Sequence, residues 1–203
     1  MEKKQQTFSK SLFAAFYQLT MAQAYWQNNQ TGESTFSLFI RRLPASRGYM
    51  IFAGLEDILD HLSTFQFNAD DIDYLRSLNH FENNFLDYLS DLKFTGQVRA
   101  MKEGSVFFPN EPVIEITAPL IEAQLIENYL LNRVNLETVL ATKAARAIYA
   151  AKGHTISEFG SRRSHGIDSA DALVRIGKIV GIESTGNIHG AAKYTQKISG
   201  TMA

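Results

Sequence analysis

Apolar residues in the first part of the chain mostly recur at helical spacing. Residues 12–27 are crowded with apolar and aromatic side chains that do not alternate, which predicts a helix. An amphipathic helix with an acidic outer face is predicted over residues 55–62, and a third over residues 81–92. Between them Asn68 is a predicted helix N-cap. The carboxylates of this region lie at helix starts and on outer faces, so solvation explains them better than a metal site.

A two-residue alternation replaces the helical spacing in two regions. Residues 34–43 alternate, with Phe36, Leu38 and Ile40 on one face, and Pro44 ends this predicted strand. Three shorter strands are predicted further along the chain, over residues 96–101, 105–108 and 113–117. A small β layer beside helices is an α+β arrangement.

Two helices are predicted after this β layer. Pro119 opens the first at a position where its missing N–H costs nothing. The second runs over residues 135–152 and ends before Gly153. These helices give a predicted division into an α+β N-terminal domain over residues 1–117, bridging helices over 118–153, and a third part over 154–203.

The third part has the order strand, helix, strand, short helix, strand. Asp168 and Ser169 are the predicted N-cap candidates of its first helix, which continues with apolar residues at helical spacing. This order implies parallel strands joined by right-handed crossovers. The fold class is therefore α/β, with an α+β part followed by βα units.

Three polar loops of this part provide the candidate site. Arg162 and Arg163 stand side by side after the first strand, and the segments 185–187 and 199–201 follow the next two. Adjacent guanidiniums alone also suit a solvated loop. In parallel α/β sheets, however, ligands bind beyond the carboxyl ends of the strands, so the three loops fall on one face. Guanidinium forks match phosphate oxygens, and this predicts a phosphate-handling site.

Other candidate residues give weaker signals. Arg41, Arg42 and Arg47 form a second basic cluster, for which phosphate contact and a solvated strand end are both compatible with the sequence. The five histidines show no metal-ligand spacing, so no metal site is predicted. His165 is the histidine in a candidate loop, and a lone loop histidine is more typical of an exposed side chain.

Composition narrows the class of protein. The chain has 203 residues, 45% hydrophobic and 20% charged, with a net charge of -1. This near-neutral charge argues against nucleic acid or an anionic membrane as the main partner. The absence of cysteine excludes disulfides and thiolate chemistry. No apolar run is long enough to span a bilayer, and residues 1–6 lack the apolar core of a signal peptide, so a cytoplasmic location is expected.

Eight short runs then occur in a fixed order along the chain. They are Tyr17-Gln-Leu-Thr-Met-Ala22, Phe39-Ile-Arg-Arg-Leu-Pro44, Gly48-Tyr49 through Ala53-Gly-Leu-Glu56, Phe108-Pro-Asn-Glu-Pro112, Ala118-Pro-Leu-Ile-Glu-Ala-Gln124, Ala141-Thr-Lys-Ala-Ala-Arg146, Glu158-Phe-Gly-Ser-Arg-Arg163 and Ser199-Gly-Thr-Met-Ala203. With these runs the sequence resembles the nicotinate phosphoribosyltransferases of the type II phosphoribosyltransferase group, over essentially its whole length.

The resemblance implies a reaction. Nicotinate and phosphoribosyl pyrophosphate would give nicotinate mononucleotide and pyrophosphate, coupled to ATP hydrolysis through a phosphorylated histidine, in NAD biosynthesis. Mg²⁺ and ATP are the implied cofactors, with none tightly bound, and the implied assembly is a homodimer whose active site lies at the subunit interface.

Site roles follow from the same resemblance. Tyr17, contributed across the interface, Phe159 and Thr201 would contact the pyridine and its carboxylate. Arg162 and Arg163 would contact the pyrophosphate, and Asn187 is a further substrate-binding residue. On the sequence alone, Tyr17 is more typical of a core or interface aromatic.

Three departures from the family pattern bear on this expectation. Ala14 and Ala15 replace the family's Thr-Asp, and Gly186 stands where the family has Ser. The chain stops at Ala203, and by the resemblance the phosphorylated histidine is the next residue. The expected structure is thus the N-terminal portion of the enzyme, ending in an incomplete TIM-like barrel, without a catalytic residue of its own and inactive alone. Two alternatives stay open: a non-catalytic fragment or interaction module, and an enzyme for another pyridine such as nicotinamide.

Overall fold

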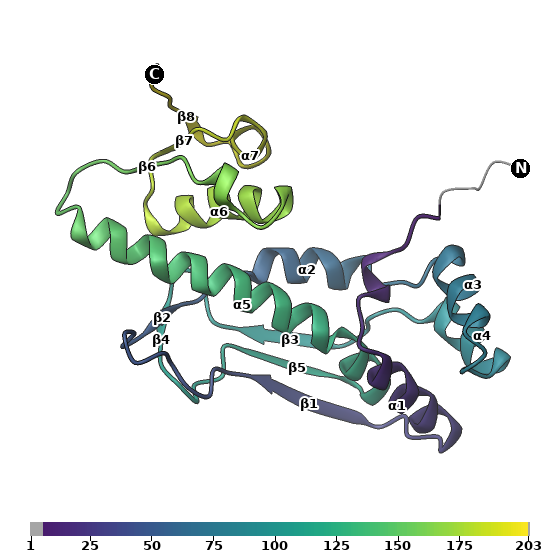
Figure 1. Ribbon diagram of the computed structural model, residues 1–203. Coiled ribbons are helices and arrows are strands. Elements are labelled where there is room, and N and C mark those ends of the chain that lie inside the picture. Colours follow the sequence, from purple (N-terminus) through teal and green to yellow (C-terminus); the bar gives the residue numbers. More distant parts are fainter. Residues whose placement is uncertain (1–5, 203) are drawn as a thin grey trace, which may run out of the picture. The chain divides into compact units, whose positions relative to one another are not determined.

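The computed structural model describes residues 6–202, so the expectations for residues 1–5 and for Ala203 lie outside the described residues. The chain forms two compact units, each assembled from separated segments (Figure 1). Unit 1 contains the chain up to Leu38, Glu56–Ala100 and Ile114–Asn132, and unit 2 contains the rest. The predicted division at residues 117 and 153 used consecutive segments, whereas the chain passes several times between these units.

Unit 1 is built on an antiparallel sheet of β1 (Glu33–Leu38), β5 (Ile114–Pro119) and β3 (Gln97–Ala100), with β5 in the middle. Alternate residues of β5 are buried, as the pattern predicts. The first part of α5 (Leu120–Ala150) lies along this sheet (Figure 1). Strand β1 is shorter than the predicted 34–43, because Leu38 pairs with Ile114 and the ladder has no partner beyond that residue.

Short helices complete unit 1. They are η1 (Lys10–Leu12), α1 (Phe16–Gln27), α2 (Leu55–Ser63, whose first residue belongs to unit 2), α3 (Ala69–Ser77) and α4 (Asn83–Asp91). The predicted helix over residues 12–27 is therefore a 3-10 turn followed by a later helix. Among the described residues, no helix is both long enough and apolar enough to cross a membrane.

The start of α3 confirms Asn68 as an N-cap and corrects one expectation. Asn68 accepts a hydrogen bond from the Asp71 N–H (2.9 Å), and Asp71 accepts one from the Asn68 N–H (2.8 Å), which is a capping box. Asp71 also accepts from the Ser9 N–H (3.0 Å) and is fully buried. The prediction that this carboxylate is solvated was wrong, because it holds two backbone segments together.

Helix α5 also corrects the sequence analysis, since one helix replaces the two predicted around a break before residue 135. No glycine or proline lies at the expected break, and Arg133 and Glu137 form an ion pair of 2.8 Å across it. An i, i+4 pair of opposite charge stabilises a continuous helix.

Unit 2 contains a parallel sheet of β6 (Ser157–Glu158), β7 (Ser184–Thr185) and β8 (Lys197–Ile198), in that order. The connections are η2 (Ser161–Arg163) with α6 (Ile167–Val180), and then α7 (Ile188–Tyr194). The predicted parallel βα order and the α/β class are confirmed. A second pair, β2 (Met50–Ile51) with β4 (Val106–Phe107), includes a strand that was not predicted, since two residues leave no alternation to detect.

Helix α6 begins earlier than expected. Its N-cap is Gly166, with φ of 91°, and neither Asp168 nor Ser169 occupies that position. A glycine enters the left-handed region without the steric cost that a side chain carries, so the chain turns into the helix at Gly166. Ser169 is instead buried within the first turns.

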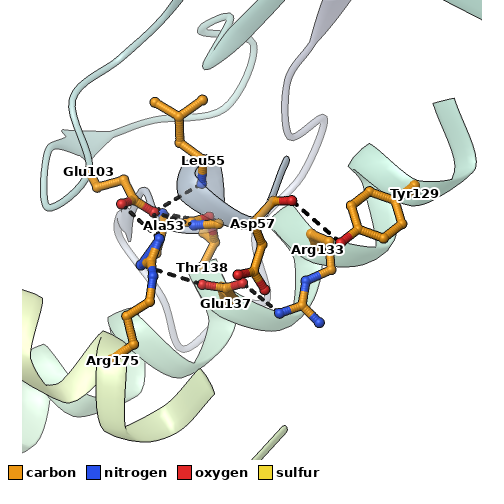
Figure 2. A network of polar contacts seen from close by, with 10 residues as sticks. Ala53, Leu55, Asp57, Glu103, Tyr129, Arg133, Glu137, Thr138 and Arg175 are labelled. Atoms are coloured by element: carbon orange, nitrogen blue, oxygen red, sulfur yellow. Dashed lines mark hydrogen bonds and ion pairs between the residues drawn. The ribbon is translucent and has the colours of Figure 1, made fainter. Parts of the chain in front are cut away.

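A buried ionic network supports α6 within unit 2 (Figure 2). Arg175 Nη2 lies 2.7 Å and 2.9 Å from the two oxygens of Glu103, and Arg175 Nη1 lies 3.7 Å from Glu137 Oε2. Glu103 Oε1 also accepts from the N–H groups of Gly54 (2.7 Å) and Leu55 (2.9 Å). Because Glu137 already pairs with Arg133, two carboxylates and two guanidiniums share one site. The network joins α6, α5, the start of α2 and the loop before β4.

Replacing Arg175 tests this network. Arg175→Met should lower the free energy of unfolding by about 3–5 kcal/mol, because it leaves Glu103 without its cation and removes one of the two cations beside the buried Glu137. Urea unfolding measures the loss. The control Arg76→Met removes exposed pairs with Asp73 and Asp87 and should change stability by about 1 kcal/mol or less. Equal effects of the two substitutions would contradict the assigned role of the network.

His61 gives a pH-dependent prediction in unit 1. It is 4% exposed, and its ring lies 3.9 Å from the Tyr129 ring and 5.6 Å from the Phe65 ring. Burial, with a smaller effect from the Lys10 charge, lowers the pKa of His61 from 6.5 to about 4. As the pH falls, His61 takes up a proton in the unfolded chain near pH 6.5 but in the folded chain only near pH 4. The folded state therefore keeps its full stability above pH 6.5 and loses stability as the pH falls toward 4. The loss should be about 3 kcal/mol.

Urea unfolding at several pH values between 7 and 4 measures this loss. The matched variant His61→Phe should have a flatter profile, while replacing the exposed His80 by Gln should leave the profile of the parent chain. Identical profiles for the parent and His61→Phe would exclude His61 as the cause.

Candidate functional site

The candidate site lies in unit 2, at the carboxyl ends of the parallel strands. Glu158, the last residue of β6, is 7% exposed and accepts hydrogen bonds from the Thr185 hydroxyl (2.6 Å) and from the Gly160 N–H. The Gly186 N–H donates to the Glu158 carbonyl (2.8 Å). One buried acid therefore ties the loop after β6 to the loop after β7.

A row of three serine hydroxyls crosses the same strands. The Ser184 hydroxyl lies 2.7 Å from that of Ser157 and 2.9 Å from that of Ser199. The Ser199 N–H also donates to the Thr185 carbonyl (3.0 Å). The start of the loop after β8 is thus fixed to the end of β7.

Phe159, in the loop after β6, contacts Gly186, in the loop after β7. The Phe159 side chain is 47% exposed, and a Cβ placed on Gly186 would lie 2.6 Å from Phe159 Cδ1. The ring therefore occupies the space that a serine side chain would need. This contact gives a physical reason for glycine at a position where the family pattern has serine.

Arg162 and Arg163 lie in η2, and both are exposed. The Arg163 N–H donates to the Gly160 carbonyl (2.8 Å), which fixes the backbone of this turn. Within residues 6–202 neither guanidinium forms a side-chain hydrogen bond or ion pair, so both are available to a ligand or to water.

Asn187 lies beside two residues that the sequence analysis did not identify. It caps α7, because its side-chain oxygen accepts from the Gly190 N–H (3.1 Å). Its amide donates to Asp171 Oδ1 (3.1 Å), and Asp171 Oδ2 lies 2.7 Å from His189 Nδ1. Asp171 is 2% exposed. The available signal in the sequence was the charged Asp171 next to the apolar positions of α6. Its partners, Asn187 and His189, belong to another element, so the sequence did not reveal the pairing.

These residues border an open hollow of about 540 Å³. Its lining includes Ser161, Ser164, Gly166, Asp171, Asn187 and His189. Arg41 and Arg42 line a second hollow of unit 2, of about 520 Å³, so two of the three arginines of the basic cluster border a hollow.

The other two candidate residues lie in different parts of the structure. Tyr17 belongs to α1 of unit 1 and is 54% exposed. Thr201 is exposed in the segment after β8. The assignment of all six substrate-binding residues stays a prediction.

Comparisons with known proteins agree with the sequence resemblance. A family model described as nicotinate phosphoribosyltransferase (NAPRTase) N-terminal domain matches residues 12–135. Nicotinate phosphoribosyltransferase pncB2 of Mycobacterium tuberculosis is 45% identical over 193 residues, which are 95% of this chain and 42% of that protein. Nicotinate phosphoribosyltransferase of Bacillus subtilis is 42% identical over 196 residues, which are 96% of this chain and 40% of that protein.

The solved structure of human nicotinic acid phosphoribosyltransferase is similar with a TM-score of 0.85 and 31% identity, covering 93% of this chain and 39% of that one. The α/β fold is therefore that of the first part of such enzymes. The chain belongs to the nicotinate phosphoribosyltransferase family, and it spans about 40% of the length of the curated relatives that it matches.

The contact between Phe159 and Gly186 can be tested by adding a side chain. Gly186→Ser should displace the Phe159 ring at a cost of about 1 kcal/mol, because the half-exposed ring can swing outward. Nuclear Overhauser contacts between the ring and residue 186 report its position. Gly200→Ser is the control, since no atom lies within 4 Å of its added Cβ. An unchanged ring position in Gly186→Ser would contradict the contact.

Proposed function

We propose that this chain forms the N-terminal part of an enzyme that condenses nicotinate with phosphoribosyl pyrophosphate. The products are nicotinate mononucleotide and pyrophosphate, in a reaction coupled to ATP hydrolysis and serving NAD biosynthesis. The observation that carries the proposal is the convergence of three loops at the carboxyl ends of β6, β7 and β8 in a member of this family.

The pyridine side of the site would be formed by aromatic and hydroxyl groups. Phe159 lies against Gly186 and is 47% exposed, so its aromatic side chain is accessible to a flat heterocycle. Thr201 offers a hydroxyl donor to the nicotinate carboxylate. Tyr17 would add a second aromatic face from the other subunit of a homodimer, which is consistent with its exposure on α1. The proposal includes a cytoplasmic location for this enzyme.

The phosphate side would be formed by Arg162 and Arg163. Both guanidiniums are exposed at the carboxyl end of β6, and each presents the planar fork that matches two phosphate oxygens. Placed there, they would bind the phosphoribosyl pyrophosphate and stabilise the negative charge that develops on the departing pyrophosphate. Asn187 would contribute by holding the loop after β7 in place.

Mg²⁺ and ATP belong to the proposal as cofactors. Among residues 6–202 no group of three or more His, Asp or Glu side chains could hold a metal ion. The acids nearest the site, Glu158 and Asp171, have their oxygens occupied by hydrogen bonds. The described residues therefore do not form a Mg²⁺ site by themselves, and no step of the reaction is assigned to the ion.

Arg162 provides the direct test of the proposed function. Arg162→Ala and Arg162→Lys should each raise the Kd for phosphoribosyl pyrophosphate roughly tenfold or more, because lysine cannot reproduce the bidentate contact. Titration calorimetry on this chain measures binding. Thermal unfolding should be nearly unchanged, since an exposed loop arginine contributes little to the core.

Arg99→Ala, which removes an exposed arginine of β3, is the matched control and should leave the Kd unchanged. A parent chain that binds neither phosphoribosyl pyrophosphate nor nicotinate would contradict the proposed function. Competition between nicotinate and nicotinamide separates the two pyridines. Normal binding by both Arg162 variants would remove Arg162 from the site.

A further inference from the structure

The hollow beside η2 contains an exposed histidine in a fixed orientation. The side chain of His189 is 72% exposed, yet its Nδ1 lies 2.7 Å from Oδ2 of the buried Asp171. Surface histidines usually sample several rotamers, and holding one in place costs side-chain entropy. A buried carboxylate is costly as well unless its oxygens are satisfied. Here both oxygens are used, one by His189 and one by the Asn187 amide.

The pairing determines which ring nitrogen can meet a ligand. A carboxylate only accepts hydrogen bonds, so His189 Nδ1 carries the hydrogen and donates it to Asp171. Nε2 is then the ring nitrogen available at the hollow that His189 lines. In the doubly protonated ring, Nδ1–H stays on Asp171 and Nε2–H can donate to an oxyanion.

The remaining lining of the hollow includes groups that can donate hydrogen bonds to an anion. Ser161 and Ser164 border it, and so does the start of α6. The Ser164 hydroxyl donates to the Gly160 carbonyl at 3.4 Å, which is longer than an ordinary O–H···O hydrogen bond. Gly166 caps this helix without a side chain, so N–H groups of its first turn have no side-chain acceptor at the cap. The carboxylate that borders the hollow, Asp171, has both oxygens occupied, while the exposed Asp168 does not line it.

We propose that His189, Ser161 and Ser164 form an oxyanion subsite that binds a phosphate group, and that Asp171 is its positioning residue. One source of that phosphate group is phosphoribosyl pyrophosphate, and for this source the inference rests on the proposed function. Free phosphate or pyrophosphate is the other source. Ser161 and Ser164 flank Arg162 and Arg163 in the sequence, but the subsite does not include the two arginines. The subsite and the arginine pair can therefore be tested separately.

The test combines binding with histidine ring spectroscopy on this chain, labelled with ¹⁵N. Inorganic phosphate, pyrophosphate and phosphoribosyl pyrophosphate are titrated in separate arms, and the His189 signal is assigned by its loss in His189→Gln. The ring should show a protonated Nδ1 in the neutral form, and a saturable shift as phosphate binds. His189→Gln should raise the Kd for phosphate roughly tenfold, as expected for loss of a hydrogen bond to a charged group.

Two further variants sharpen the test. His165→Gln removes an exposed histidine that precedes α6 and does not line the hollow, so it should leave phosphate binding unchanged. Asp171→Asn should move the neutral His189 ring to the tautomer protonated at Nε2, which a merely structural role would not do. If Asp171→Asn fails to fold, the exposed His189 variant still decides the proposal.

The outcomes separate this inference from the proposed function. Equal phosphate affinity in the parent and His189→Gln, or a parent ring protonated at Nε2 in its neutral form, would overturn the subsite. Phosphoribosyl pyrophosphate binding that depends on Arg162 but not on His189 would overturn the subsite and leave the proposed function standing. Phosphate binding that depends on His189, without any binding of phosphoribosyl pyrophosphate, would support the subsite and remove the proposed function.

Discussion

The ion pairs of Arg175 are the interaction on which unit 2 depends. Arg175 and Asp171 stand one turn apart on α6, and both side chains are buried although each is ionisable. Arg175 fixes the helix to Glu103 and Glu137, while Asp171 fixes it to Asn187 and His189. A single helix thus transmits the geometry of the ionic network to the loops of the site. Buried ion pairs add less to stability than their number suggests, but removing one partner is strongly destabilising because it leaves a buried charge uncompensated.

The site combines a rigid base with exposed chemical groups. Glu158, Thr185 and the serine row use their polar atoms to bind one another, so they hold the three loops in register. Phe159, Arg162 and Arg163 are exposed above this base. Such a division of roles is expected at a binding site, because side chains that satisfy each other are poor ligands, while side chains held by a stiff backbone lose little freedom on binding.

Local patterns predicted most of the elements and part of the site. Glycine-containing loops and the helical spacing of apolar residues identified the parallel strand order, and the Asn68 signal identified the cap of α3. The break expected before residue 135 was wrong, because the Arg133–Glu137 pair sustains the helix. Asp171 and His189 were missed for a physical reason: they are distant in sequence and belong to different helices, so their relation exists only once α6 and α7 pack. The space for Phe159 over Gly186 likewise depends on two loops.

The serine row constrains how this sequence can change over evolutionary time. Ser184 stands in the middle and contacts two hydroxyls, whereas Ser157 and Ser199 each contact one within the row. A hydroxyl carries one donor and two acceptor positions, so the central residue has no equivalent substitute among apolar side chains. Loss of an outer serine removes one contact of the row, but loss of Ser184 removes the partner of both neighbours. Substitutions at position 184 should therefore be accepted together with changes at 157 and 199, so that the three positions vary as a group across related sequences.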